Sequence, residues 1–162
     1  EFVFGTAAPE SVHSVDIGSV RLTERALPDR PAGPAAVLAA AGVADAILEA
    51  VSLPGHPATV IGVGGTYTSL AAISLGLDEY DRDTVHGSLL TGDDLGRLVG
   101  RLAELSVAET AAIPSLDPAR APVILGGAIV AEAALRRSGA GRIVVSERDI
   151  LDGIALTLVA GA

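Results

Sequence analysis

The stretch that decides the fold of this chain is Val60-Ile-Gly-Val-Gly-Gly-Thr-Tyr-Thr-Ser-Leu-Ala-Ala-Ile73. Its β-branched start predicts a strand that ends at Gly64-Gly65, and Thr66 opens a run of helix-forming residues. A strand that ends in two glycines before a helix brings free backbone N–H groups and the positive end of a helix dipole to one point. This pattern is typical of a phosphate-binding turn. The alternative is a purely structural turn, in which glycine relieves backbone strain and Thr66 caps the helix.

The composition indicates one domain with an aliphatic core. Of the 162 residues, 49% are hydrophobic and only 2% are aromatic, so Ala, Val, Leu and Ile must fill the core. The net charge of −9 argues against nonspecific nucleic-acid binding, which needs a basic face. Cys is absent, which excludes disulfides and thiolate catalysis and makes a cytoplasmic origin the default. No apolar run has the length of a membrane span, so no membrane partner is expected.

The pattern along the chain predicts an α/β fold. Strands alternate with helices, which favours a sheet layered by helices. Ligands in such sheets bind outside the carboxyl ends of the strands, where both double glycines of the sequence fall. Residues 76–91 are expected to be mostly loop, and Ser146 with Asp149 is expected to cap the last helix. The predicted strands cover residues 2–6, 12–23 with an interruption at Gly18, 59–63, 123–125 and 142–145. The predicted helices cover 35–51, 66–75, 95–105, the residues that follow Gly126-Gly127 up to Arg137, and 150–159.

Two further segments carry weaker functional signals. Gly126-Gly127 repeats the glycine pattern without a hydroxyl group beside it, and close packing is the preferred interpretation there. Asp16-Ile-Gly-Ser19 would place a carboxylate near a metal ion or a water molecule, but a strand with a bulge at Gly18 is favoured. Arg21 and Glu24 would contact a phosphate and a metal ion, or else pair with each other. These residues alone suggest phosphate binding and identify no reaction.

Several segments together resemble a known family. They occur in the order Ser14-Val-Asp-Ile-Gly-Ser-Val-Arg-Leu-Thr-Glu24, Gly62-Val-Gly-Gly-Thr66, Leu116-Asp-Pro-Ala-Arg-Ala121, Val123-Ile-Leu-Gly-Gly127 and Asp149-Ile-Leu-Asp-Gly153. In this order and spacing they resemble the second domain of the exopolyphosphatase and guanosine pentaphosphate phosphatase family, in the version typical of actinobacteria. That family belongs to the actin-like ATPase superfamily. The resemblance therefore implies a ribonuclease H-like fold, a mixed sheet flanked by helices.

The resemblance also implies a reaction and its site. The family hydrolyses the terminal phosphate of inorganic polyphosphate or guanosine pentaphosphate with Mg²⁺. Glu1 resembles the last residue of the family's Asp-Ile-Gly-Gly-Gly-Ser-Thr-Glu loop, a glutamate near the magnesium ion. The general base belongs to the preceding domain, so no catalytic residue is expected here. The phosphate-binding residues implied for this chain are Gly64, Gly65, Thr66 and Arg21.

We therefore expect residues 1–162 to form a single truncated domain of a two-domain phosphatase, without its N-terminal domain, first strand and phosphate loop. The absence of Met and the strand-like start Glu1-Phe2-Val3-Phe4 fit this expectation. Such a fragment should fold but show little activity by itself. Family members are often dimers, which makes a homodimer possible, and an uncovered sheet edge would favour self-association. The alternative functions are a phosphate- or nucleotide-sensing module without hydrolysis, and a regulatory or interaction domain.

Overall fold

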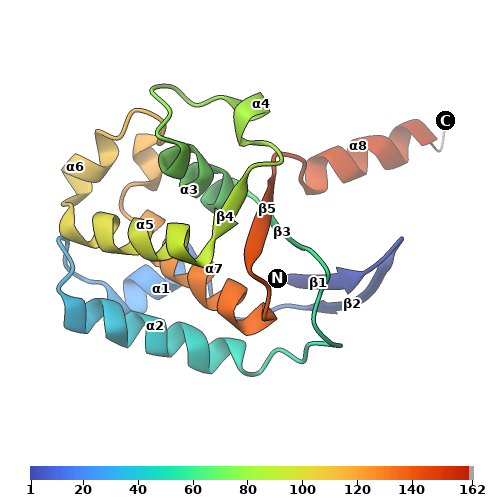
Figure 1. Ribbon diagram of the computed structural model, residues 1–162, viewed down its shortest axis with the longest axis horizontal. Helices are drawn as coiled ribbons and strands as arrows, with labels where there is room; N and C mark the ends of the chain where they lie inside the picture. The colour runs from blue at the N-terminus through green and yellow to red at the C-terminus, as the bar shows by residue number, and fades with distance from the viewer. Residues whose placement is uncertain (161–162) are drawn as a thin grey trace.

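A three-stranded mixed sheet forms the centre of the computed structural model, which describes residues 1–160. The strand order is β3 (Val60–Val63), β5 (Arg142–Ser146) and β4 (Leu89–Thr91). β3 runs parallel to β5, with Val60 opposite Ile143, and β4 runs antiparallel to β5. Helices pack against this sheet (Figure 1). The predicted α/β architecture, a mixed sheet flanked by helices, is confirmed.

A separate two-stranded hairpin opens the chain. β1 (Phe2–Gly5) pairs antiparallel with β2 (Pro9–His13), and the register shifts between Phe4 and Gly5. The Phe2 and Phe4 side chains pack against the hydrophobic core. Val3 lies between them, and its side chain points to the opposite face of the hairpin, where it is exposed. One face of the hairpin therefore supplies the two phenylalanines of the chain to the core.

The central helix is α7 (Ile124–Ser138), which packs against four other helices (Figure 1). Ala and Gly fill much of its buried surface, which lets neighbouring backbones approach closely. Its four neighbours are α1 (Ser19–Ala26), α2 (Pro34–Leu48), α3 (Gly65–Leu75) and α5 (Gly92–Glu104). The remaining elements are the short helices α4 (Arg82–Val85) and α6 (Val107–Ala111), the 3₁₀ turn η1 (Pro118–Arg120) and the last helix α8 (Ile150–Ala160).

The apolar residues at i, i+3, i+4 and i+7 from Leu95, a spacing that predicts one buried helix face over residues 95–105, do form such a face in α5. Leu95, Leu98, Val99 and Leu102 line the buried face of α5. The helix begins with a capping box, in which the Thr91 hydroxyl accepts a hydrogen bond from the backbone N–H of Asp94 and the Asp94 carboxylate accepts one from the N–H of Thr91. These reciprocal bonds satisfy donors that a helix start otherwise leaves free. The hydrogen bond that the Thr91 hydroxyl donates to the Asp94 carboxylate, together with the one from Thr91 N–H, holds the pKa of Asp94 below its usual value.

The strand predicted over residues 12–23 is wrong. β2 ends at His13, and helix α1 begins at Ser19 after an extended Gly18. The apolar residues of this segment nearly alternate with polar ones, which is the pattern of a strand. The alternation breaks once, so local spacing alone predicts a strand with a bulge. In the folded chain Leu22 is fully buried, and α1 packs along α7. Tertiary packing therefore favours a helix over a strand for residues 19–26.

The strand predicted over residues 123–125 is also wrong. Val123 is the N-cap of α7, so Gly126 and Gly127 lie in the first turn of a helix and do not end a strand. Their packing role is confirmed, because a Cβ atom at Gly127 would lie 2.7 Å from Thr66 Cγ2 and 3.3 Å from Ser19 Cβ. These two glycines let α7 approach α1 and α3.

Two smaller predictions are refined by the structure. Residues 76–91 are mostly loop, as predicted, but they also contain the short elements α4 and β4. The last helix forms as predicted, but its start is capped by Asp149, whose carboxylate accepts a hydrogen bond from Leu151 N–H, while Asp149 N–H donates to Asp152. The Ser146 hydroxyl bonds to the backbone of Arg148 instead. An acid suits this position because it complements the helix dipole.

Helix α8 leaves its apolar side chains uncovered and extends away from the rest of the molecule (Figure 1). A helix that is apolar on all sides is normally buried, and a large exposed apolar patch favours association. No helix among the described residues has the length and apolar character that crossing a membrane requires. The exposed large side chains of α8, each 52–77% accessible, are Ile150, Leu151, Ile154, Leu156, Leu158 and Val159.

We predict that the chain self-associates through α8. Replacing Ile150, Ile154 and Leu158 by Gln should shift sedimentation towards the monomer without lowering the melting temperature, because these side chains contribute little to the core. Leu38→Gln, at an equally exposed position on α2, is the matched control and should change nothing. A monomeric parent chain at high concentration would contradict the prediction.

Candidate functional site

The turn between β3 and α3 has the backbone that the sequence predicts. Gly64 has φ 92° and ψ 167°, a conformation that residues with a side chain rarely adopt. A Cβ atom at Gly64 would meet nothing within 4 Å. Glycine is therefore required here by the backbone conformation and not by lack of space.

The start of α3 carries no side-chain cap. Gly64 is its N-cap, and no side chain accepts a hydrogen bond from the first turn. The first intrahelical bond runs from Thr68 N–H to Gly64 O at 3.3 Å. Thr66 therefore does not cap this helix, which removes the structural explanation for its hydroxyl. An uncapped first turn presents N–H donors and the positive end of the helix dipole to an anion.

The residues after the glycines are held by packing. Thr66 is half-buried, with its methyl group against Gly127 of α7. The Tyr67 ring lies against β3, where a Cβ atom at Gly62 would approach it to 2.6 Å, and burial raises the pKa of its phenol. These contacts fix the direction in which α3 leaves the sheet. The glycine turn is therefore a rigid element.

Arg21 lies on another side of α1 from the glycine turn. Ser19 and Thr23 of α1 face α7, and Arg21 between them projects from the opposite side of the helix. Its guanidinium pairs with the Asp16 carboxylate, which also binds Arg25. The hydrogen bond from Arg25 and the charge of Arg21 hold the pKa of Asp16 below its usual value. Arg21 is thus paired with Asp16 and not with Glu24, the partner that the sequence suggests.

The acidic candidates do not form a metal site by themselves. Glu1 is exposed and precedes β1, and Asp16 is bound by two arginines. Within residues 1–160, no three His, Asp or Glu side chains are placed to hold a metal ion. Mg²⁺ needs only one or two protein carboxylates when phosphates and water supply the other oxygens. The proposed role of Glu1 at a magnesium ion stays a prediction.

Arg120 is the residue that sequence reasoning missed at this turn. It lies in η1, and its guanidinium sits against Gly65, the first residue of α3, so closely that a Cβ atom there would clash with it. Only the resemblance drew attention to residues 116–121, and no spacing connects residue 120 with residue 65. The fold brings a cation to the start of α3 from a distant part of the chain.

A cavity of about 530 Å³ opens beside this arginine. Ser115 in its wall is almost fully buried, and its Oγ has no hydrogen-bond partner among the described residues. The cavity is lined by Thr68, Ser69, Glu79, Tyr80, Pro114, Ser115, Leu116, Asp117 and Arg120. It therefore combines the start of α3, an arginine and several hydroxyl groups.

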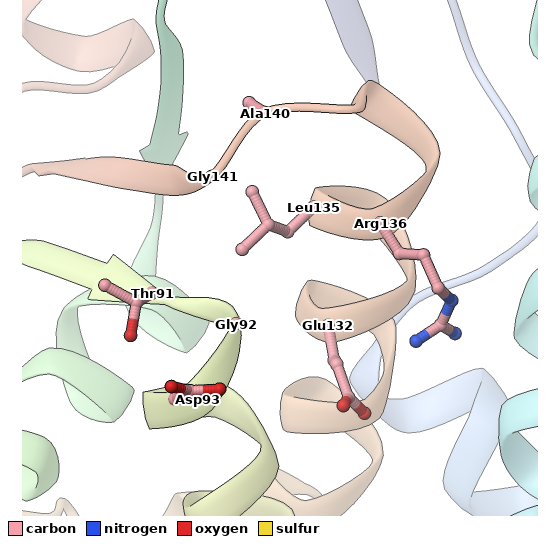
Figure 2. Close-up of a pocket in the computed structure, with 8 residues that line it drawn as sticks. All are labelled: Thr91, Gly92, Asp93, Glu132, Leu135, Arg136, Ala140 and Gly141. Atoms are coloured by element: carbon pink, nitrogen blue, oxygen red, sulfur yellow. The ribbon is translucent and has the colours of Figure 1, made fainter.

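A second cavity, of about 490 Å³, lies between α7 and the turn from β4 to α5. Figure 2 shows Leu135 pointing into it and Arg136 pointing away, and Arg136 pairs with Asp45 at 2.7 Å. The charged side chains that remain at its wall are Asp93 and Glu132. Two carboxylates without a cation repel a phosphate, so the cavity at Arg120 is the better candidate.

Comparison with known proteins agrees with the resemblance. The sequence model of the Ppx/GppA phosphatase family matches residues 1–160. Exopolyphosphatase 2 from Mycobacterium tuberculosis is 39% identical over 98% of this chain and 52% of its own length. Exopolyphosphatase 1 from Mycobacterium bovis is 28% identical over 91% of this chain and 44% of its own length.

Solved structures show the same relationship. The crystal structure of the Aquifex aeolicus member of the Ppx/GppA family superposes with a TM-score of 0.91. It is 28% identical, and the match covers 98% of this chain and 52% of that one. The chain thus spans about half the length of these relatives.

Proposed function

Because this chain belongs to the Ppx/GppA phosphatase family, we propose that it supplies the phosphate-binding half of an enzyme that hydrolyses the terminal phosphoanhydride bond of inorganic polyphosphate. Guanosine pentaphosphate is the second substrate of this proposal, since it carries the same kind of bond. In this proposal, residues 1–162 are the second domain of a longer, two-domain phosphatase. Its support is a family match over all of the described residues, 1–160.

The uncapped start of α3 is the observation that carries the proposal. Phosphoryl transfer is accelerated mainly by positioning and by stabilising the charge on the phosphate oxygens. Backbone N–H groups after Gly64 would bind these oxygens, and the glycine conformation keeps them pointing at one place. The tight packing of Thr66 and Tyr67 would prevent the donors from moving during the reaction.

Mg²⁺ is part of the proposal as a requirement of the whole enzyme. The ion would neutralise phosphate oxygens when bound. The carboxylates of residues 1–160 do not by themselves make a site for it, so no step is assigned to it through residues of this chain. The water-activating carboxylate is likewise assigned to the half of the relatives that this chain does not cover.

The test uses a chimaera in which these residues replace the matching half of Exopolyphosphatase 2 from Mycobacterium tuberculosis. We expect phosphate release from polyphosphate in the presence of Mg²⁺ and none with EDTA. Gly64→Ala should lower kcat/KM about tenfold or more, because the strained residue displaces the N–H donors. The ratio of kcat/KM for polyphosphate and guanosine pentaphosphate would identify the preferred substrate.

Gly76→Ala is the matched control. Gly76 also has positive φ, with no atom within 4 Å of an added Cβ, but it lies at the opposite end of α3. Alanine at Gly76 should also strain the backbone, though less than at Gly64 because residues with a side chain can reach the left-handed helical region, and it should leave kcat/KM nearly unchanged. A folded chimaera that binds polyphosphate but releases no phosphate would overturn the proposal and favour a sensing module, and one that does neither would favour a regulatory domain.

A further inference from the structure

Glu147 lies at the same end of the sheet as the glycine turn. Val63 of β3 is opposite Ser146 of β5 in the parallel pair. The next residues, Gly64 and Glu147, therefore leave the two strands side by side, and paired strands are about 4.8 Å apart. The backbone of Glu147 is thus a direct neighbour of the turn to which the proposed function assigns phosphate.

The Glu147 carboxylate is joined to α3 through Tyr80. It accepts a hydrogen bond from the Tyr80 hydroxyl. Tyr80 lines one cavity together with Thr68 and Ser69 of α3, and the hydroxyl groups of Thr68 and Tyr80 are neighbours. Thr68 belongs to the first turn of this helix, since its N–H donates to Gly64 O. The negative charge of Glu147 therefore lies beside the end of α3 that attracts anions.

This charge is partly hidden from water. The Glu147 side chain is only 13% exposed, so water and salt screen it less than they screen the exposed carboxylates of Glu79 and Asp117 at the cavity. Burial, together with the hydrogen bond to Glu147, raises the pKa of the Tyr80 phenol, so Tyr80 adds no second negative charge. A carboxylate left without a cation at this position would oppose phosphate binding at the turn.

Arg82 neutralises Glu147. Its Nε donates to the carboxylate at 3.1 Å, and one of its terminal nitrogens donates to the backbone oxygen of Glu147 at 3.2 Å. No other arginine within residues 1–160 pairs with this carboxylate. Figure 1 shows that α4, which begins at Arg82, and the loop after it lie next to the end of β5. A segment distant in the sequence thus brings the compensating cation to this end of the sheet.

We propose that Arg82 is a positioning residue of the phosphate site, which masks the charge of Glu147 so that a phosphate group can bind at the glycine turn. Arg82 does not contact the phosphate and acts through Glu147. Glu147 in turn holds the segment in place, since it also binds Tyr80 and donates its backbone N–H to His86 Nδ1 at 3.2 Å. The inference rests on the proposed function and adds an electrostatic role for two residues outside the turn.

The test measures binding of sodium tripolyphosphate to the 162-residue chain by calorimetry, in EDTA and at low salt, after melting curves show that each variant is folded. Arg82→Gln should weaken binding about threefold to tenfold, because it leaves the carboxylate of Glu147 uncompensated. Glu147→Gln should tighten binding about twofold to threefold, because it removes the repulsive charge while its amide oxygen still accepts from Tyr80. The double variant should bind like the parent.

Two further measurements separate charge masking from a structural role. Arg82→Lys keeps the charge and loses the planar fork, so it should bind almost as tightly as the parent. At about 1 M salt the screening length falls to about 3 Å, so the differences between the variants should shrink. A structural role predicts the opposite results, a weakened Arg82→Lys variant and differences that salt leaves unchanged.

Arg97→Gln is the matched control. Arg97 pairs with Asp94 on α5, and their side chains are 71% and 21% exposed, close to the 67% and 13% of the pair under test. This control pair lies at the other end of the sheet, because Thr91, which caps α5, is opposite Arg142 at the start of β5. Arg97→Gln should therefore leave tripolyphosphate binding unchanged.

The two proposals fail in different ways. If Glu147→Gln weakens binding as Arg82→Gln does, and the double variant binds no better, the pair only holds the structure and the inference is wrong. If Gly64→Ala weakens binding and Arg82→Gln does not, the inference is wrong and the proposed function stands. If the variants follow the expected order but the chimaera releases no phosphate, charge masking stands and hydrolysis is wrong. Absence of binding by the parent chain would overturn the inference, and the chimaera would then decide the proposed function alone.

Discussion

The 162-residue chain by itself should release phosphate from polyphosphate at less than about a thousandth of the rate of the chimaera. The glycine turn offers donors to the phosphate, but within residues 1–160 no group of three acidic or histidine side chains is placed to hold a metal ion. Positioning water, metal and phosphate together is the main source of catalysis in phosphoryl transfer, so donors alone should achieve little.

The measurement is phosphate release at equal concentrations of the two proteins, after melting curves show that both are folded. Tripolyphosphate binding to the isolated chain provides the internal control, because it shows that the turn is accessible. Comparable turnover by the isolated chain would mean that its own residues complete the site. The assignment of the water-activating group to the uncovered half would then be wrong.

Replacing Gly126 by Val should be the most destabilising of the substitutions considered. A Cβ atom at this position would lie 2.7 Å from the backbone oxygen of Ser19 and would clash with the Thr23 hydroxyl. Neither neighbour is the free end of a flexible side chain, so α1 must move away from α7. We expect a loss of about 3 kcal/mol in the free energy of unfolding, near the upper end for overpacked cores.

Urea unfolding checks this expectation, with Gly100→Ala as the control. Gly100 lies on the exposed side of α5, where an added Cβ meets nothing within 4 Å. Alanine there should raise stability by about 0.5–1 kcal/mol, since glycine is a poor residue within a helix. If Gly126→Val had the same free energy of unfolding as the parent, the stability of the fold would not depend on the close approach of α7 to α1.

The same packing links this region to the candidate site. Gly127, next to Gly126, contacts Thr66 at the start of α3 and Ser19 of α1. A shift of α1 would therefore disturb the support of the glycine turn as well as the core. We expect any tripolyphosphate affinity of a folded Gly126 variant to fall together with its stability.

The sequence by itself determined the features that depend on neighbouring residues. The β-branched run ending at Gly64-Gly65 predicted the turn from β3 to α3, and the i, i+3, i+4 spacing predicted the buried face of α5. Both patterns are local, because glycine conformation and helix periodicity act over a few residues. The order of several short segments also indicated the family, which the comparisons confirm.

Only the tertiary structure decided the rest. Short apolar segments such as residues 15–22 and 123–125 fit a strand or a helix equally well in isolation. The packing of α1 against α7 made the end of the first segment a helix and the second segment the start of α7. The approach of Arg120 to Gly65 joins residues far apart in the chain, which no local spacing encodes. Long-range packing therefore placed Arg120 at the glycine turn, because hydrophobic burial and close glycine contacts, not sequence proximity, set which segments meet.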